Sequence, residues 1–253
     1  MRQALRRILG RNATAEGDGH PDPDAATIDP ADQAILARAR PYTMTSEQRL
    51  LALIDAVRYI VARDVPGAFA ECGVWRGGSV LAMIGALQEF GADDRDIHLY
   101  DTFEGMTEPT EHDTSALDPP ALETWQEAEG EGERAWNDLF DPAIFNEDAV
   151  RATLLETGYP ADRLHLHRGP VEETLPRQAP GPLALLRLDT DWYASTRHEL
   201  QHLYPLLAKG GVLIVDDYGH WQGARQAVDE YFGDEPPLLL NRIDYTGRIA
   251  VKH

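Results

Sequence analysis

Segments with the pattern of short buried strands alternate with segments of helical pattern along most of this chain. Strands separated by helices pair in parallel, because each crossover returns the chain to the same end of the sheet. The alternation therefore predicts an α/β fold, a Rossmann-like, doubly wound and mostly parallel sheet covered on both faces. The expected strands lie at 67–73, 96–101, 163–169, 183–189 and 211–217, and the expected helices at 79–91, 147–157 and 195–208.

Two further segments extend this pattern. Residues 45–63 carry apolar side chains at helical spacing, and Thr45 with Gln48 forms a capping box that would begin the helix. Residues 241–253 alternate between apolar and polar side chains, which predicts strands. We expect them to close the sheet as an antiparallel C-terminal edge hairpin.

We expect one domain over residues 31–253, preceded by a flexible arm over 1–30. The arm begins with basic residues and continues rich in Asp, Gly, Pro and Ala. Within the domain, the acidic, Pro-containing segment 104–145 does not fit the alternation. It is either a solvated insertion or a lid over a site, and long loops in α/β folds tend to carry function.

The composition excludes several classes of partner. The formal net charge of −20 argues against nucleic acid or an anionic membrane as the main partner. No apolar run reaches the roughly 18 residues of a membrane span, and arginines interrupt the N-terminal apolar residues, so we expect no secretory signal. The single cysteine, Cys72, fits a reducing compartment, and we expect a cytoplasmic protein.

Residues 198–202 read HELQH, which matches the H-E-x-x-H pattern of zinc metalloproteases. On a helical wheel of about 100° per residue, Leu200 and Leu203 share the face that must be buried. His198 and His202 then fall on the opposite face, toward water, whereas a zinc-binding helix turns its histidines into a walled cleft. We interpret the motif as coincidental.

Paired aspartates follow two of the expected buried strands. LALLRLDTD ends with Asp189 and Asp191, and GGVLIVDD ends with Asp216 and Asp217. Ligands bind beyond the carboxyl ends of strands in an open parallel sheet, and these two strands should be neighbours. Carboxylates that meet there would repel one another, so a cation among them is the simplest resolution. Oxygen ligands favour Mg²⁺, Mn²⁺ or Ca²⁺, although either pair alone could merely cap a helix or turn.

The turn in GAFAECGVWRGGSV runs from an expected strand into an expected helix, as a nucleotide-binding turn does. Trp75 stands where the second glycine of G-x-G-x-x-G belongs, which disfavours an NAD-type pyrophosphate turn. Gly73 and Gly77 would let a ligand approach the backbone, or serve only tight strand–helix packing. Asp101, at the end of the next expected strand, is placed to pair with ribose hydroxyls.

The motifs together resemble the macrocin O-methyltransferase family over about residues 40–250. The segments that carry the resemblance occur in order as ECGVWRGGS, LYDTFEGM, RGPVEETLP, LRLDTDWYAST and VDDYGHWQGARQAVDEY. The family methylates sugar hydroxyls of glycosylated natural products with S-adenosylmethionine and Mg²⁺. The resemblance therefore implies a class I methyltransferase sheet, a small-molecule glycosylated acceptor and both cofactors. It departs in TGRIAV, which lacks an expected aromatic residue, and in the insert.

The resemblance also assigns roles to single residues. It implies cofactor-binding roles for Thr43, Met44, Glu71, Gly73, Trp75, Gly77, Ser79, Asp101, Val171 and Glu172, and metal-ligand roles for Asp189, Asp216 and Asp217. On chemical grounds, Asp189 or Asp191 would accept the proton of the acceptor hydroxyl, with His220 as a weaker candidate. We also expect a homo-oligomer from the resemblance alone.

Two alternatives keep part of this pattern. A metal-binding relative of the same fold could take part in hydroxylation or act as a non-catalytic partner of another enzyme. An α/β alternation with an acid after the second strand is also compatible with a nicotinamide oxidoreductase. The missing G-x-G-x-x-G and the number of strand-end aspartates disfavour the oxidoreductase.

Overall fold

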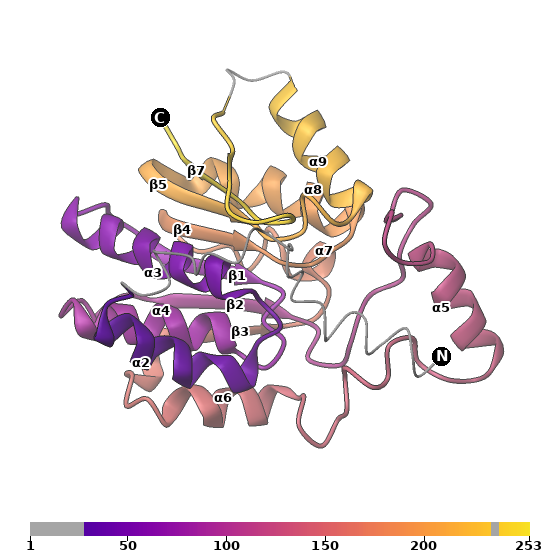
Figure 1. The fold of residues 1–253 in the computed structure, drawn as a ribbon, viewed down its shortest axis with the longest axis horizontal. Helices are drawn as coiled ribbons and strands as arrows, with labels where there is room; N and C mark the ends of the chain where they lie inside the picture. Colours follow the sequence, from indigo (N-terminus) through magenta and orange to yellow (C-terminus); the bar gives the residue numbers. More distant parts are fainter. Residues whose placement is uncertain (1–27, 234–237) are drawn as a thin grey trace, which may run out of the picture.

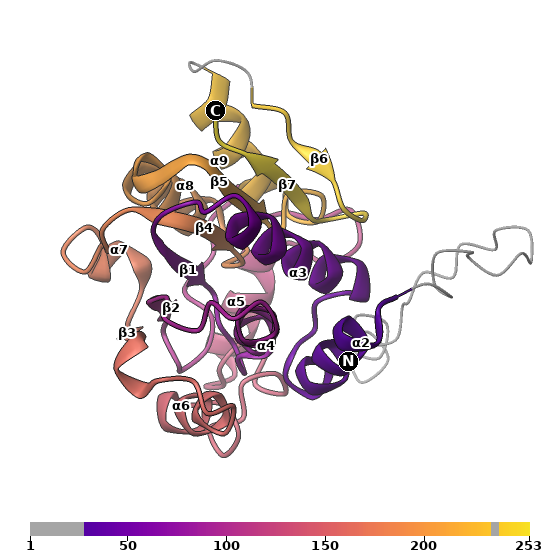
Figure 2. The same cartoon turned by 90° about the vertical axis from the view of Figure 1, so that its left-hand side faces the viewer.

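The computed structural model describes residues 28–233 and 238–253. Its centre is a seven-stranded sheet in the order β3-β2-β1-β4-β5-β7-β6 (Figure 1; β6 is labelled in Figure 2). The strands are β1 (Ala68–Cys72), β2 (Ile97–Asp101), β3 (Leu164–Arg168), β4 (Leu183–Leu188), β5 (Leu207–Val215), β6 (Asn241–Arg242) and β7 (Arg248–Val251). The first five pair in parallel, whereas β7 pairs antiparallel with β5 and with β6. The predicted mostly parallel sheet and its antiparallel C-terminal edge are confirmed.

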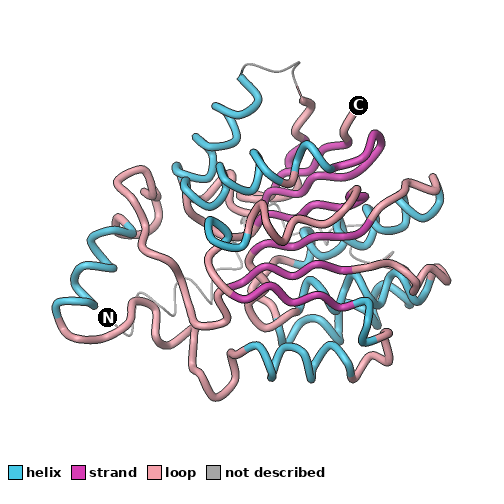
Figure 3. The backbone as a smooth tube through the Cα atoms, turned by 180° about the vertical axis from the view of Figure 1, so that it is seen from behind, coloured by secondary structure: helices cyan, strands magenta, loops and turns pink. Residues whose placement is uncertain are grey.

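Helices cover both faces of the sheet, as Figure 2 and Figure 3 show. On one side α2 (Pro30–Ala39), α3 (Glu47–Ala62) and α4 (Gly78–Glu89) pack on one another, with α6 (Glu147–Leu155) beside β3. On the other side lie α7 (Val171–Thr174), α8 (Tyr193–His202) and α9 (Gln222–Gly233). A buried apolar cluster fills each interface, so the sheet is the middle layer of three.

Two expected helix boundaries differ from the structure. The N-cap of α3 is Ser46, whose hydroxyl accepts from the Arg49 amide, instead of Thr45. Thr45 is buried and turns its hydroxyl to a side chain in β4. The helix expected over 195–208 ends at His202, because Pro205 follows in a 3₁₀ turn (Tyr204–Leu206) and β5 begins at Leu207.

The segment 104–145 contains one helix, α5 (Ala121–Gly130), which stands apart from both helix layers in Figure 1. Its first part is fixed to the domain by Asp113, a fully buried side chain. Asp113 accepts from the amides of Thr110 and Tyr193, the second of which begins α8. The start of the insert is therefore anchored, and its role as a lid stays a prediction.

Two short 3₁₀ turns complete the described elements, Arg40–Tyr42 before α3 and Ala161–Arg163 before β3. Most of the expected flexible arm, residues 1–27, lies outside the described residues. Across the described part of the chain, no helix combines the length and apolar character needed to cross a membrane.

Candidate active site

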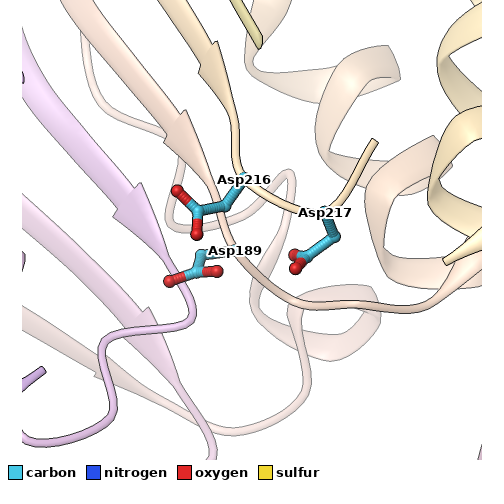
Figure 4. A group of neighbouring side chains, drawn as sticks. All are labelled: Asp189, Asp216 and Asp217. Carbon is cyan, nitrogen blue, oxygen red and sulfur yellow. The ribbon is translucent and has the colours of Figure 1, made fainter. Parts of the chain in front are cut away.

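The carboxylates of Asp189, Asp216 and Asp217 gather at the carboxyl ends of β4 and β5 (Figure 4). These strands are neighbours, with Leu188 opposite Val215, so the residues after each strand meet at one edge of the sheet. One oxygen from each carboxylate lies within 4.8 Å of the others. Among the described residues, this is the one group of three or more acidic, His or Cys side chains with such spacing.

A buried arginine from β4 lies among these carboxylates. Arg187 is 2% exposed and donates to Asp189 Oδ2 at 2.8 Å and to Asp216 Oδ1 at 2.7 Å. It also forms an ion pair with Glu71, its cross-strand neighbour on β1, and donates to the Thr45 hydroxyl at 3.0 Å. The sequence carried a signal for this residue, because a lone arginine inside the apolar run LALLRL requires buried anionic partners.

A second arginine reaches the same carboxylates from α3. Arg49 forms an ion pair with Asp216 and another with Asp244, at 3.0 Å, in the turn between β6 and β7. Both oxygens of Asp216 therefore face guanidinium groups. No sequence pattern distinguished Arg49 from other polar residues of its helix, since its partners are distant in the chain.

Carboxyl groups still outnumber guanidinium groups in this cluster. Asp217 and Asp191 have no ion-pair partner among the described residues. Burial raises the pKa of Asp189 to about 7 and that of Asp191 to about 8. Burial and the neighbouring carboxylates also raise the pKa of Asp217 well above its usual range. The two arginines modify the expectation of wholly unbalanced aspartates, but the remaining charge and the three converging oxygens fit a hard divalent cation.

Asp191 is held beside this cluster by unusual backbone geometry. Its φ of 66° lies in the left-handed region, which costs a non-glycine residue about 1 kcal/mol or more. Its amide donates to Asp217 Oδ2 at 3.3 Å, and the indole of Trp221 donates to its Oδ1 at 2.8 Å. The carboxyl group of Asp191 also lies in hydrogen-bond contact with that of Asp217.

The predicted cofactor turn joins β1 to α4 and is organised by Asp101. The Oδ2 atom of Asp101 accepts from the amides of Val74 and Trp75 at 2.7 and 2.9 Å, and Oδ1 accepts from Phe103. Gly73 has φ 80°, and a Cβ there would lie 1.9 Å from the Asp189 carbonyl oxygen. Close packing of the β1 and β4 ends therefore already requires this glycine.

The residues predicted for the amino-acid end of the cofactor lie around this turn. Glu71 is fully buried, and its Oε2 atom has no hydrogen-bond partner among the described residues. Burial raises the pKa of Glu71 to about 8, although the charge of Arg187 opposes this. Gly77, with φ 85°, is the N-cap of α4, and Ser79 is buried in the first turn of that helix.

The remaining predicted cofactor residues are less closely connected. A Cβ on Gly78 would lie 2.5 Å from the Thr43 Cβ, so Thr43 packs on the start of α4, whereas Met44 is 47% exposed. Val171 is buried in the apolar cluster beneath α7, and Glu172 is exposed. The segment that follows β3 is held next to Asp101, because the Gly169 amide donates to the carbonyl oxygen of Asp101.

His220 is engaged on both ring nitrogens. Nε2 lies 2.9 Å from Asp118 Oδ2 in the insert, and Nδ1 lies 3.2 Å from the Tyr245 hydroxyl. Its backbone amide donates to the Asp217 carbonyl oxygen. These contacts fasten the insert to the site and leave His220 a poorer candidate for accepting a proton than Asp191.

An aromatic cluster borders the aspartates. Trp192 packs against Trp136 of the insert and Trp221 at the start of α9, with ring centroids 5.6 and 5.0 Å apart. Trp192 is 2% exposed and its indole donates to the Thr107 carbonyl. Trp192 therefore joins the insert to the body of the domain.

The HELQH motif does not form a metal site. His198 and His202 are partly exposed on α8, with ring centroids 4.4 Å apart. His198 Nε2 lies 3.3 Å from the Leu175 carbonyl, and Leu200 and Leu203 are fully buried as expected. Glu199, between the two histidines, is completely buried, a feature that the sequence analysis did not identify.

Comparisons with known proteins show the family to which this chain is similar. The family model described as Macrocin-O-methyltransferase (TylF) matches residues 29–249. The chain is 34% identical to an 8-demethyl-8-(2,3-dimethoxy-alpha-L-rhamnosyl)-tetracenomycin-C 4'-O-methyltransferase of Streptomyces olivaceus, over 98% of this chain and 88% of that protein. It is 32% identical to a mycinamicin III 3''-O-methyltransferase of Micromonospora griseorubida, over 75% and 70% of the respective lengths.

A solved structure of the O-methyltransferase NovP superposes with a TM-score of 0.69 at 29% identity, covering 83% of this chain and 82% of that chain. The sheet order, the strand-end aspartates and the extent of the family match lead to the same assignment. The chain belongs to the macrocin O-methyltransferase family and is an O-methyltransferase.

Proposed function

We propose that this protein transfers the methyl group of S-adenosylmethionine to a sugar hydroxyl of a glycosylated natural product, with a divalent cation at Asp189, Asp216 and Asp217. The observation that supports this most is the convergence of these carboxylates beside the β1–α4 turn. The relatives' names support the acceptor class, because they describe methylation of a tetracenomycin glycoside and of mycinamicin III.

The methyl donor would lie against the carboxyl ends of β1 and β2. The buried Oε2 of Glu71 lacks a protein partner, which suits the ammonium group of the donor. Asp101 would orient the ribose while its amide bonds hold the turn in place. We further propose that the other residues to which the family resemblance gives a cofactor-binding role contact S-adenosylmethionine. These are Thr43, Met44, Gly73, Trp75, Gly77, Ser79, Val171 and Glu172.

The acceptor would approach the aspartates from the side of the insert. A divalent cation held by these three aspartates would lower the pKa of a bound sugar hydroxyl, which is a poor nucleophile at neutral pH. Arg187 and Arg49 keep Asp189 and Asp216 in place and limit the repulsion between them. An in-line displacement depends on this alignment, because the sulfonium carbon must face the hydroxyl oxygen.

Asp191 is the favoured acceptor of the hydroxyl proton. Asp189 forms an ion pair with Arg187, which weakens it as a base, whereas Asp191 has no ion-pair partner among the described residues. Trp221 fixes one oxygen of Asp191, so the carboxylate is already oriented before the acceptor arrives. Of the three candidates, Asp191 therefore fits the role better than Asp189 or His220.

The test is methyl transfer from isotopically labelled S-adenosylmethionine to a panel of glycosides with vicinal diols. We expect label in a glycoside in the presence of Mg²⁺ and its loss after chelation, with activity restored by added Mg²⁺ or Mn²⁺. Monomethylated analogues of the accepted glycoside, blocked at either hydroxyl, identify the position. Label transfer that persists unchanged after exhaustive chelation would refute the metal requirement and leave only a metal-independent O-methyltransferase.

A further inference from the structure

Glu199 is a completely buried carboxyl group in the middle of α8. Its Oε1 atom accepts from the Thr190 hydroxyl at 3.0 Å, the Cys72 thiol, a weak donor, lies against the carboxyl group, and Oε2 has no conventional N–H or O–H donor among the described residues. Burial raises its pKa well above the usual range. A buried and half-satisfied carboxyl group destabilises a fold, so a hydrophobic residue would serve packing better at this position.

Thr190, the residue that donates to Glu199, lies in the loop that carries the proposed metal ligand and the proposed base. Thr190 stands between the proposed metal ligand Asp189 and the proposed base Asp191. The backbone of this loop is otherwise held by few bonds. The Asp189 amide donates to the Cys72 carbonyl, the Trp192 amide to the Thr190 carbonyl and the Asp191 amide to Asp217 Oδ2.

The bond from Thr190 to Glu199 ties the middle of this loop to α8, while the Trp221 indole holds the Asp191 carboxylate from the start of α9. The loop needs such a tie, because Asp191 occupies the left-handed region at φ 66° and would relax without restraint. Glu199 cannot itself touch a ligand, since it is fully covered by protein.

We propose that Glu199 is a positioning residue, which through the Thr190 hydroxyl holds the 189–191 loop in the geometry that metal binding and proton transfer require. This role rests on the proposed function of the loop. It accounts for a completely buried carboxyl group beside Leu200, a residue of the apolar cluster under α8.

Hydrogen exchange of the metal-free protein tests the restraint itself. In Glu199→Met and in Thr190→Val, we expect the amides of residues 189–192 to exchange about fivefold faster, the factor that one ordinary hydrogen bond supplies. The double variant should match either single variant, because both remove the same bond. Glu199→Gln keeps the acceptor oxygen and should exchange like the wild type, as should Gln201→Met on the exposed side of α8.

Calorimetric titration with Mn²⁺ tests the consequence for the site. We expect about tenfold weaker binding in Glu199→Met and Thr190→Val, with wild-type affinity in Glu199→Gln. The thermal midpoint of Glu199→Met should equal or exceed that of the wild type, because the buried carboxyl group is gone.

The outcomes separate the two proposals. Unchanged exchange in both single variants, or additive effects in the double variant, would overturn the positioning role. Unchanged Mn²⁺ affinity in variants with faster exchange would also overturn it, because the loop would then move without consequence for the site. A wild type that binds no Mn²⁺ but shows the exchange pattern would instead refute the metal proposal and retain the restraint on the loop.

Discussion

Arg187 and Asp217 are charged residues of the same site that differ in how far their charges are compensated by neighbouring groups. Arg187 has three carboxylate partners and the Thr45 hydroxyl, so its charge is fully compensated. Asp217 has no ion-pair partner in the described part of the chain, and its neighbours are carboxylates. Replacing Arg187 by a neutral residue should therefore lower the stability of the fold, whereas replacing Asp217 by a neutral residue should raise it.

Arg187→Met is expected to lower the free energy of unfolding by about 3–5 kcal/mol, because Glu71 would remain buried without a counter-charge and Asp216 would keep only Arg49. The matched control is Arg225→Met, which removes an ion pair with Asp229 that is about half exposed on both sides. That control should cost at most about 1 kcal/mol. Urea denaturation measures both, and similar losses in the two variants would contradict the structural role of Arg187.

Asp191→Asn is expected to lower the turnover of an accepted glycoside by about 10²- to 10⁴-fold, since the variant cannot take up the hydroxyl proton. The amide oxygen can still accept from the Trp221 indole, so the loop geometry should persist. Affinity for S-adenosylhomocysteine should stay unchanged. Asp229→Asn, at an exposed position of α9, should keep full turnover, and a wild-type rate in Asp191→Asn would transfer the base role to another residue.

The sequence predicted the site residues that follow from strand ends and missed those that follow from packing. Asp189, Asp216 and Asp217 could be placed because each follows an apolar strand, and neighbouring parallel strands end at the same edge. Arg49 and Asp244 could not, because their contact depends on how α3 and the β6–β7 turn approach the sheet. Glu199 was missed because its neighbours suggested an exposed face.

At the scale of elements, the same contrast holds for helices and strands. The five parallel strands were predictable from apolar runs, whereas the end of α8 was not, since Leu203 and Leu207 fit one helical face although a turn separates them.

The strands β2 and β3 carry a cluster of titratable histidines. His98 on β2 stacks on His165 of β3 with centroids 4.5 Å apart, and its Nδ1 lies 3.0 Å from His167 Nε2.

This histidine cluster should make the β2–β3 edge sensitive to acid. Burial and the two neighbouring imidazoles lower the pKa of His98 to about 4, against about 6.5 in an unfolded chain. Between these pH values, His98 is protonated in the unfolded chain but neutral in the folded chain. The free energy of unfolding therefore falls as the pH decreases through this window. Above it, both states are neutral at this position and the effect disappears.

Urea midpoints of the wild type and His98→Gln at about pH 7.5 and about pH 5 test this assignment. The wild type should lose more stability than the variant between the two conditions, because glutamine does not titrate. Asp96, whose pKa is lowered through its bond to His165, contributes only at still lower pH. Equal losses in both proteins would show that His98 titrates normally.

At the scale of the whole molecule, the site lies where the order of the strands changes direction. The chain proceeds from β1 outward to β3 and then returns to β4 on the other side of β1. Ligands of doubly wound sheets bind at such a point, beyond the carboxyl ends of the strands. A homo-oligomer and a cytoplasmic location remain predictions, and light scattering of the purified protein would test the first.

A bound cation should stabilise the entire fold. With Mg²⁺ at about 100 times its dissociation constant, the wild type should gain about 2.7 kcal/mol of unfolding free energy. Asp217→Asn should gain little from Mg²⁺, yet exceed the wild type in stability when no metal is present, because an uncompensated carboxylate has been removed. Equal Mg²⁺ responses in the two proteins, measured by urea denaturation, would argue against Asp217 as a ligand.

The most direct test of the account is calorimetric titration of S-adenosylhomocysteine into the wild-type protein, with Mg²⁺ present and again after chelation, with NAD as the control ligand. We predict saturable binding of one S-adenosylhomocysteine per chain and no heat from NAD. An absence of binding in both conditions would contradict the cofactor assignment, and with it the proposed methyl transfer.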